Sequence, residues 1–308
     1  MEHRIINLAT IKIMKNILLI FLFTLSAKVL FAQDTDLLGE LGEDDTKTYV
    51  TNAFKSPRVI SSHSMEMLPV GALDFRILHR FGQLNQGFDE FFGLDNATMR
   101  MSFDYGITKN FTAGIGRSTF KKELDGFLKY RIIQQSKGHR SFPISILWAS
   151  GMMYNGLKNP YQESTTQDKF YKRVSYFHQL IIGRKFSESF SLQISPMLIH
   201  RNLVDNLLEE NNTLAINLGG RYKVTKRIAV VWDYTYAFGQ FLTTYHTQPL
   251  SIGVDIETGG HVFQLHFSNA TGMNERAYIS EKNGDWFKGD IQFGFNLSRV
   301  FQVAKQKI

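Results

Sequence analysis

The sequence contains no cysteine among its 308 residues. This absence excludes disulfide bonds, thiolate metal sites and thiol nucleophiles. It also excludes the lipid-modified N-terminal cysteine of bacterial lipoproteins. Proline is scarce, with 6 residues, whereas phenylalanine and glycine are frequent, with 26 and 24 residues. The composition favours one large all-β domain, because β-barrels commonly exceed about 200 residues as a single unit.

Long apolar runs are absent except for one near the start of the chain. That run, residues 17–25, follows Lys15, and a cleavage point follows Ala32, although Leu30 occupies the −3 position where a small residue is usual. The layout predicts a secretory signal peptide over residues 1–32, because the run is too short for a membrane-spanning helix. A helix of a soluble core is the alternative. Met14 is a more natural start of the chain than the first residue.

Negative charge is concentrated directly after this segment. Residues 33–50 contain one lysine and six acidic residues, namely Asp34, Asp36, Glu40, Glu43, Asp44 and Asp45. Low hydrophobicity with charge of one sign is typical of a solvated, unfolded stretch. Residues 33–70 are therefore expected to form an acidic, flexible N-terminal segment or a plug. The rest of the chain is basic, but it has no lysine/arginine run, so no nucleic-acid partner is expected.

From about residue 70 onward, apolar and polar residues alternate with a period of two, and helical periodicity is absent. Leu73 and Phe75, for example, alternate with Asp74 and Arg76. Such alternation between turn signals predicts β-strands. The predicted strands are 71–81, 98–105, 111–119, 123–133, 142–153, 174–186, 190–203, 213–223, 228–236, 249–256, 261–269 and 288–301.

The connections between these strands alternate in length. Compact turns such as GITKN, VTKR and ETGG alternate with longer connections such as residues 82–97, 154–173 and 270–287. Alternating lengths around an even number of strands are typical of an outer-membrane barrel with periplasmic short turns. The barrel must close, because hydrocarbon offers no partner to an unpaired backbone N–H. The sequence therefore predicts an all-β fold: a closed antiparallel transmembrane β-barrel of about 12 strands over residues 71–303, with periplasmic N- and C-termini and a tail, residues 304–308.

In such a barrel, the apolar face contacts outer-membrane lipid and the polar face lines the lumen. The predicted lumen-facing charged residues are Asp74, Arg76, Arg80, Arg100, Asp104, Asp125, Lys129, Arg131, Arg221, Asp233 and Asp290. Because an isolated buried ion is costly, these residues either pair as a filling or line a hydrated solute path. Their basic excess favours small, slightly anionic solutes. The stretch VISSHSMEMLPVG, residues 59–71, is expected to plug the lumen or to lie beneath it.

The stretch HFSN, residues 266–269, resembles the His-x-Ser-Asn signature of outer-membrane lipid hydrolases, the phospholipase A barrels and the lipid A deacylases. The resemblance implies His266 as general base, Ser268 as nucleophile and Glu281 as the residue that orients the imidazole. Positions two apart on a strand share a face, which brings hydroxyl and imidazole within reach. The alternation argues against this site, because Leu265 and its apolar neighbours occupy the lipid-facing side and leave the pair facing the lumen.

Metal and cofactor sites are not expected. The other histidines lie on different strands or loops, without a second ligand close in the sequence. The stretch GIGRS, residues 114–118, is only superficially like a phosphate-binding loop, because it lies inside a predicted strand and no helix follows it.

Several stretches together resemble an outer-membrane β-barrel family of unknown function from Bacteroidota. They are DFRILHRFG, YGITKNFTAGIGRS, DGFLKYR, YFHQLIIGRKF, GGRYKVTKRIAV, HVFQLHFSNATGMNER and GDIQFGFNLSRVF. The resemblance covers residues 49–303 and implies the fold and the outer-membrane location. It implies no activity, because the family has no assigned reaction or binding residues.

The pattern as a whole favours a non-enzymatic role, as a small-solute channel, a transport accessory or a structural wall protein. An outer-membrane lipid hydrolase that uses Ser268 and His266 is the alternative. A secreted soluble β-protein is a third reading, because soluble sheets also alternate. The sequence predicts neither the solute nor the oligomeric state.

Overall fold

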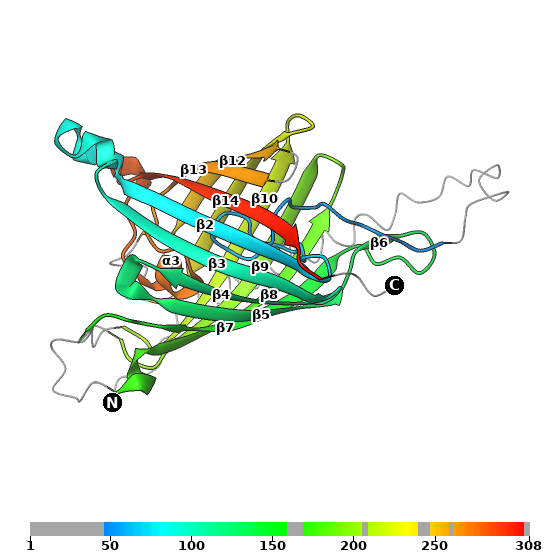
Figure 1. Ribbon diagram of the computed structural model, residues 1–308, viewed down its shortest axis with the longest axis horizontal. Coiled ribbons are helices and arrows are strands. Elements are labelled where there is room, and N and C mark those ends of the chain that lie inside the picture. Colours follow the sequence, from blue (N-terminus) through cyan, green and yellow to red (C-terminus); the bar gives the residue numbers. More distant parts are fainter. Residues whose placement is uncertain (1–45, 159–168, 205–208, 240–246, 259–260, 305–308) are drawn as a thin grey trace, which may run out of the picture. The chain divides into compact units, whose positions relative to one another are not determined.

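A computed structural model of the chain describes residues 46–158, 169–204, 209–239, 247–258 and 261–304. Within these residues, twelve antiparallel strands close into a barrel (Figure 1). The barrel strands are β2 (Ala72–Gln83), β3 (Ala97–Thr108), β4 (Phe111–Ser118), β5 (Leu124–Ile133), β7 (Ser145–Tyr154), β8 (Val174–Lys185), β9 (Phe190–Arg201), β10 (Asn212–Lys223), β11 (Ile228–Ala237), β12 (Leu250–Thr258), β13 (His261–Ser268) and β14 (Gln292–Gln302).

Each barrel strand pairs with the strands before and after it in the chain, and β14 pairs with β2 to close the ring. The closing pair runs from Gln292 opposite Gln83 to Gln302 opposite Ala72, with one register shift between Gln292 and Gly294. A closed ring leaves no row of unpaired N–H and C=O groups, which a strand edge in hydrocarbon would expose. The predicted closed antiparallel barrel is confirmed.

Two strands begin three or more residues later than the sequence pattern predicts. The strand expected from position 142 begins at Ser145, because Phe142 instead accepts a hydrogen bond from the backbone N–H of Ser136. The last strand begins at Gln292, because a 3-10 turn before it ends at Gly289 with a φ of 78°. Both differences concern turn geometry and leave the number of strands unchanged.

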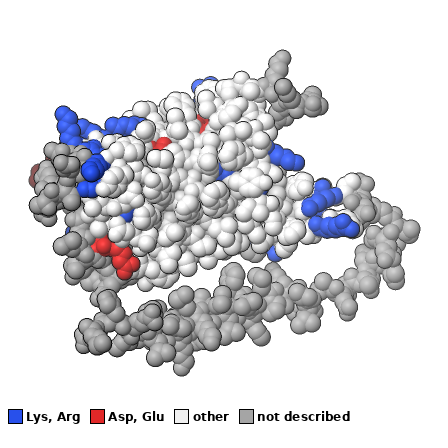
Figure 2. Space-filling model, turned by 90° about the horizontal axis from the view of Figure 1, so that it is seen from below, with Lys and Arg blue, Asp and Glu red and all other residues white. Residues whose placement is uncertain are grey.

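The outer face of the barrel is apolar and the inner face is polar. On β4 and β5, Ile115 and Leu128 are 62% and 47% exposed, whereas Asp125 and Lys129 are buried. The side of the barrel is largely free of charge, and lysine and arginine gather toward its two ends (Figure 2). This distribution is the reverse of a soluble protein and fits a wall whose outer side faces lipid.

The two ends of the barrel differ in their connections. The end called here the short-turn end carries the turns after β3, β5, β8, β10 and β12, and there β1 (Thr48–Tyr49) pairs with β6 (Ser136–Lys137). The opposite end is called the long-loop end. Its loops contain η2 (Leu84–Gln86), η3 (Phe88–Gly93), η4 (Phe120–Lys122), η5 (Phe170–Arg173), α3 (Glu275–Ser280) and η6 (Trp286–Lys288). None of the helices in the described ranges is long and apolar enough to cross a bilayer.

Two segments fill the interior of the barrel. Residues 53–68, called the inner segment, precede β2 and pack Phe54, Val59 and Met65 against wall residues of β7 and β8. Residues 269–285, called the inner loop, connect β13 to β14 and include α3, all of whose residues are buried. The lumen is therefore occupied from both ends of the barrel.

A charged side chain placed on the outer face tests the orientation of the wall. Ile115→Arg would put a guanidinium in mid-strand against lipid, and we expect a loss of roughly 2–4 kcal/mol in the free energy of unfolding. The matched control is Val224→Arg in an exposed turn at the short-turn end, where a change of about 0–1 kcal/mol is expected. Urea unfolding of both variants in phospholipid vesicles measures the difference. Equal stabilities would show that position 115 does not face hydrocarbon.

Candidate functional site

The candidate site is the occupied lumen, which is lined by charged side chains from most of the barrel strands. The predicted lumen-facing residues that are buried there are Asp74, Arg76, Arg80, Arg100, Asp104, Asp125, Lys129, Arg221 and Asp233. Period-two alternation places them, because every second side chain of a strand points to the same face. Charges of both signs thus line the lumen, and three of them, Arg80, Lys129 and Asp233, bind the inner segment directly.

Two of the predicted lumen-facing residues lie elsewhere. Arg131 is only half-buried at the end of β5, where its guanidinium donates to the carbonyl of Lys109 and to Asn110 Oδ1. The placement of Asp290 in the lumen was wrong. Asp290 lies in the connection before β14, where its carboxylate accepts from Asn85 Nδ2 and from the backbone N–H of Asp285. The cause is the late start of β14, which leaves residue 290 outside the pleated wall.

Some wall charges pair with one another. Arg76 Nη2 lies 2.7 Å from Asp74 Oδ2, and Arg100 Nε lies 2.9 Å from Asp125 Oδ2. Within the described residues, neither carboxylate oxygen of Asp104 has a hydrogen-bond donor. The hydrogen-bonding capacity of the buried charged side chains is thus only partly satisfied. A buried carboxylate without a hydrogen-bond donor is costly.

Asp233 on β11 is the main anchor of the inner segment. Its Oδ2 atom accepts from the backbone N–H groups of Ile60 (3.3 Å), Ser61 (2.8 Å) and Ser62 (2.9 Å). Its Oδ1 atom accepts from Ser62 Oγ at 2.9 Å and from Asn217 Nδ2 at 2.6 Å. Successive N–H groups that converge on one anion form a nest, which suits a carboxylate that forms no ion pair within the part of the chain that the structure describes.

Amide side chains of the wall bind the backbone on either side of this anchor. Gln264 on β13 donates to the carbonyl of Val59 at 2.6 Å. Gln193 on β9 binds in both directions, since it donates to the carbonyl of His63 at 2.8 Å and accepts from the N–H of Met65 at 2.9 Å. The inner segment has little regular secondary structure, so these side chains replace the hydrogen bonds that a helix or strand would supply.

A lysine and a glutamate fix the two limbs of the inner segment. Lys129 Nζ on β5 donates to the carbonyls of Glu66 at 2.6 Å and Pro57 at 3.3 Å. The carboxylate of Glu66 in turn accepts from the N–H groups of Ala53 and Phe54. Burial raises the pKa of Glu66, while these two N–H groups and Lys129 act in the opposite direction. The segment is therefore held as a compact hairpin.

An ion pair joins the inner segment to the inner loop. Arg58 Nη1 lies 2.8 Å from Glu275 Oε1, and both side chains are buried. His63 lies beside this pair, with Nε2 3.4 Å from the same oxygen and its ring 4.4 Å from that of Phe127. Burial, followed by the charge of Arg58, lowers the pKa of His63 well below its ordinary value, so the imidazole is neutral.

The inner loop is fixed to the long-loop end by a second group of charges. Arg276 pairs with Glu123 and Glu281, and Lys121 Nζ lies 2.7 Å from Glu281. Burial raises the pKa of Glu281, but Arg276 and Lys121 outweigh it and lower the pKa to about 2. Asn274 begins α3 by accepting the N–H of Ala277. These ion pairs thus fix the inner loop to the connection between β4 and β5.

The structure does not assemble the predicted hydrolase site. His266 and Ser268 share the lumen face of β13 and are buried. Ser268 Oγ accepts from Ser251 Oγ at 2.8 Å and approaches the carbonyl of Ala270, and neither ring nitrogen of His266 has a hydrogen-bond partner among the described residues. Glu281 binds Arg276 and Lys121 instead of the imidazole. The pair is therefore part of the wall and does not face lipid, as the alternation indicated.

Several contact residues carry no signal that sequence reasoning used. Arg58 and Glu275 lie outside the predicted strands, and their pairing joins positions 217 apart in the chain. Gln193, Gln264 and Asn296 stand at inward positions of their strands and are neutral, so a search for charged residues passed over them. The alternation of side chains along each strand could have identified them as inward-facing wall residues. It does not identify the residues that they bind.

Comparisons with known proteins concern the same region of the chain. The profile of a family described as "Membrane bound beta barrel domain (DUF5777)" matches residues 54–301. No match is found among curated protein sequences. Among solved structures, the NanC porin aligns over 74% of this chain and 98% of its own, with 10% identity and a TM-score of 0.46. The KdgM porin aligns over 75% and 99%, with 7% identity and a TM-score of 0.44. The outer membrane protein Omp33 of Acinetobacter baumannii aligns over 74% and 97%, with 8% identity and a TM-score of 0.36.

A designed disulfide tests the position of the inner segment, since the chain has no cysteine of its own. A Cβ atom at position 219 would lie 2.9 Å from Cγ2 of Val59. We therefore expect Val59→Cys with Gly219→Cys to form a disulfide under mild oxidation, because Cγ2 of Val59 stands where a cysteine Sγ would lie and is one bond length short of contact with a sulfur on position 219. Mass spectrometry of non-reduced tryptic peptides detects the bond.

The control for this test pairs Val59→Cys with Val224→Cys, which lies in an exposed turn. No intramolecular disulfide is expected in the control. A missing bond in the 59–219 variant, in protein whose barrel is folded, would mean that the inner segment does not occupy the lumen.

Proposed function

Because the chain belongs to the family of membrane-bound β-barrel domains (DUF5777), we propose that it is an outer-membrane channel for small solutes whose pathway the inner segment closes. The bacterial outer membrane is the location of closed barrels with an even number of antiparallel strands and an apolar outer band. The channel role rests on one observation. The inner segment is bound to the wall largely through hydrogen bonds and ion pairs that water or a polar solute can replace.

The energetics of those contacts favour reversible closure. A hydrogen bond exchanged for one with water changes stability by about 0.5–1.5 kcal/mol, or by about 1.5–3 kcal/mol where one partner is charged. Four of the five contacts of the Asp233 carboxylate are such bonds to the inner segment. A plug held only by apolar packing would instead expose that apolar surface to water when it left the lumen, and water cannot replace such contacts. The inner segment also buries apolar side chains, Phe54, Val59 and Met65 among them, and their exposure to water opposes withdrawal.

Unsatisfied polar groups of the wall support the same proposal. Asp104, Gln179 and His266 are buried on the lumen face and have polar atoms without a partner among the described residues. Such groups favour any state in which water reaches them. A hydrated, open lumen therefore recovers free energy that the closed state loses.

The charge of the interior supports a preference for anions. Two buried cations of the wall donate to the inner segment, Arg80 to Ser61 Oγ and Lys129 to the carbonyl of Glu66, and in neither bond is the acceptor a carboxylate. A cationic lining lowers the energy of a passing anion. We include small anionic solutes in the proposal.

The remaining parts of the proposal concern export and orientation. Residues 1–32 act as the signal peptide and residues 33–52 as an acidic leader to the inner segment. The short-turn end faces the periplasm, as do the two termini, and the chain originates from Bacteroidota. The alternation of short and long connections around the ring supports this orientation.

Release of the anchor tests the channel. Asp233→Ala removes the acceptor of three backbone N–H groups, and we expect the open probability in planar bilayers to rise on the order of tenfold or more, since hydrogen bonds to a charged group contribute about 1.5–3 kcal/mol. The matched control is Asp89→Ala in the exposed loop after β2, which should conduct as the wild type does. Reversal potentials in a salt gradient measure the anion preference.

Heat-modifiable migration in detergent gels establishes that each variant is folded before recording. Folded wild type and Asp233→Ala barrels that both fail to conduct would contradict the channel and leave a closed wall protein. Conductance in the wild type that Asp233→Ala does not increase would contradict the role of the inner segment as the closing element.

A further inference from the structure

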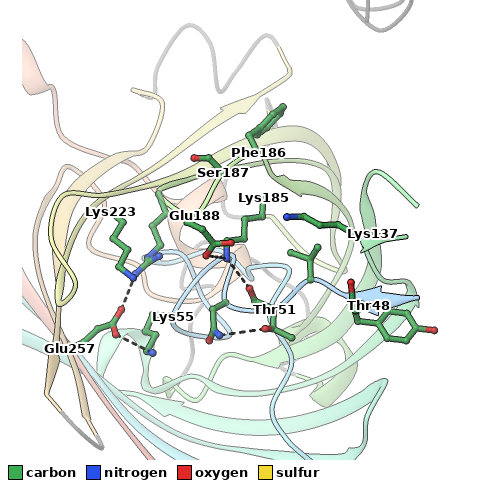
Figure 3. A pocket seen from close by; sticks show the side chains of 14 residues that line it. Thr48, Thr51, Lys55, Lys137, Lys185, Phe186, Ser187, Glu188, Lys223 and Glu257 are labelled. Carbon is green, nitrogen blue, oxygen red and sulfur yellow. Dashed lines mark hydrogen bonds and ion pairs between the residues drawn. The ribbon is translucent and has the colours of Figure 1, made fainter. Parts of the chain in front are cut away.

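A cavity of about 530 Å³ opens at the short-turn end of the barrel. One wall is the stem that leads into the inner segment, residues 48–52, and the other walls come from the ends of barrel strands and their turns (Figure 3). The cavity is called here the mouth pocket. Its size is within the range of about 300–1,000 Å³ that is usual for small-molecule sites. Its apolar side chains are those of Tyr49, Val50 and Phe186, so most of the lining is polar.

Positive charge predominates in the mouth pocket. Its cationic side chains are Lys55, Lys137, Lys185, Arg221 and Lys223, and its acidic side chains are Glu188 and Glu257. The cations come from the inner segment, β6, β8 and β10, which are far apart in the sequence. The fold therefore gathers a charge that no basic run in the sequence announces.

Glu188 is shared among three lysines. Its carboxylate lies 2.7 Å from Lys185 Nζ. The hydrogen bond and the charge of Lys185, and then the charges of Lys137 and Lys223, lower the pKa of Glu188, so this carboxylate is ionised at neutral pH. The side chain of Glu188 is 86% exposed, and an exposed ion pair is weak because water and salt screen it. One exposed carboxylate thus leaves much of the positive charge of three lysines available to another anion.

Glu257 is shared between the inner segment and the wall. Its carboxylate lies 3.0 Å from Lys55 Nζ and 2.9 Å from Arg221 Nη2. Arg221 is 6% exposed, and its Nε atom, 3.7 Å from Asp255, has no hydrogen-bond partner among the described residues. Removal from water strengthens the attraction between such a guanidinium and an anion. The existing carboxylates therefore leave both charge and hydrogen-bonding capacity of the cations unused.

We propose that the mouth pocket binds a small polyanion, a polar solute with two or more carboxylate or phosphate groups. Several separated anionic groups can contact cations on both sides of the cavity at once, which a monoanion cannot do. Lysine ammonium groups act as point charges without a fixed geometry, so they bind carboxylate and phosphate alike. The attraction is electrostatic, and salt weakens it.

The complete mouth pocket exists only while the inner segment occupies the lumen, because Lys55 belongs to that segment and the stem forms one wall. A ligand shifts a two-state equilibrium toward the state that it binds better. A bound polyanion therefore favours the closed state. The binding itself does not depend on the channel proposal, whereas this consequence, closure of the pathway by a polyanion, rests on the proposed function.

Isothermal titration calorimetry of the full chain in detergent tests the binding. The probes are citrate and pyrophosphate, and the monoanion acetate is the comparison. We expect at least one of the two polyanions to bind on the order of tenfold or more tightly than acetate, and several-fold more weakly in about 0.5 M sodium chloride. The tighter of the two probes identifies the preferred anionic group as carboxylate or phosphate.

Two double variants locate the site. Lys137→Gln with Lys223→Gln removes two cations of the mouth pocket, and we expect the affinity for the tighter probe to fall several-fold or more. The matched control is Lys226→Gln with Arg227→Gln, which removes the same charge from the exposed turn next to Lys223, outside the lining. Heat-modifiable migration in detergent gels establishes that each variant is folded.

Planar bilayers test the consequence. The tighter probe, added to the side that the short turns face, should lower the open probability of Asp233→Ala several-fold, and acetate should not. Combining Asp233→Ala with the Lys137/Lys223 substitutions should remove this response.

Two results would overturn the proposed site. One is a folded wild type that binds neither polyanion more tightly than acetate, and the other is an equal loss of affinity in the Lys226/Arg227 control. If a polyanion binds and no variant conducts, the site stands and the channel proposal fails. If Asp233→Ala conducts and neither polyanion binds, the reverse holds. Binding that leaves the open probability unchanged or raises it would contradict closure by the polyanion.

Discussion

Hydrogen-bond closure of the backbone is the constraint on which the rest of the structure depends. A sheet in hydrocarbon cannot leave an edge unpaired, so β14 must return to β2. Once the ring is closed and lipid surrounds it, the apolar residues of each strand turn outward and the polar residues inward. The interior is then a narrow space lined by arginine, aspartate and amide side chains. The polar groups of this interior need hydrogen-bond partners, and nearly every other feature of the lumen supplies such partners.

The solution observed here is to fill the interior with backbone. Side chains of the wall act as donors and acceptors for a segment that lacks regular hydrogen bonds, as Asp233 does for Ser61 and Ser62. Buried ion pairs such as Arg100 with Asp125 contribute little net stability, because desolvation offsets their attraction. Their role is better described as specificity, because a wrong register would leave a buried charge without its partner.

Local patterns of sequence predicted the barrel well and its contents poorly. The strands follow from alternation over adjacent residues, so even short strands such as β12 and β13 were found. Placement of Asp290 in the lumen was wrong because it required the exact start of a strand, which a turn at Gly289 decides. The inner segment has no period at all. Its partners are contacts such as Ile60 with Asp233, 173 positions apart, and no local pattern encodes them.

The ion pair of Arg58 and Glu275 couples the two parts of the chain that occupy the lumen. It joins the inner segment, which enters from the short-turn end, to the inner loop, which enters from the long-loop end. Withdrawal of the inner segment would remove Arg58 and leave Glu275 buried beside Tyr278 without its cation. Leaving one partner of a buried pair uncompensated costs about 3–5 kcal/mol. The inner loop would therefore shift, or water would enter to solvate Glu275. On the proposed channel function, the long-loop end would therefore respond to withdrawal at the short-turn end, and the two ends of the lumen would open together.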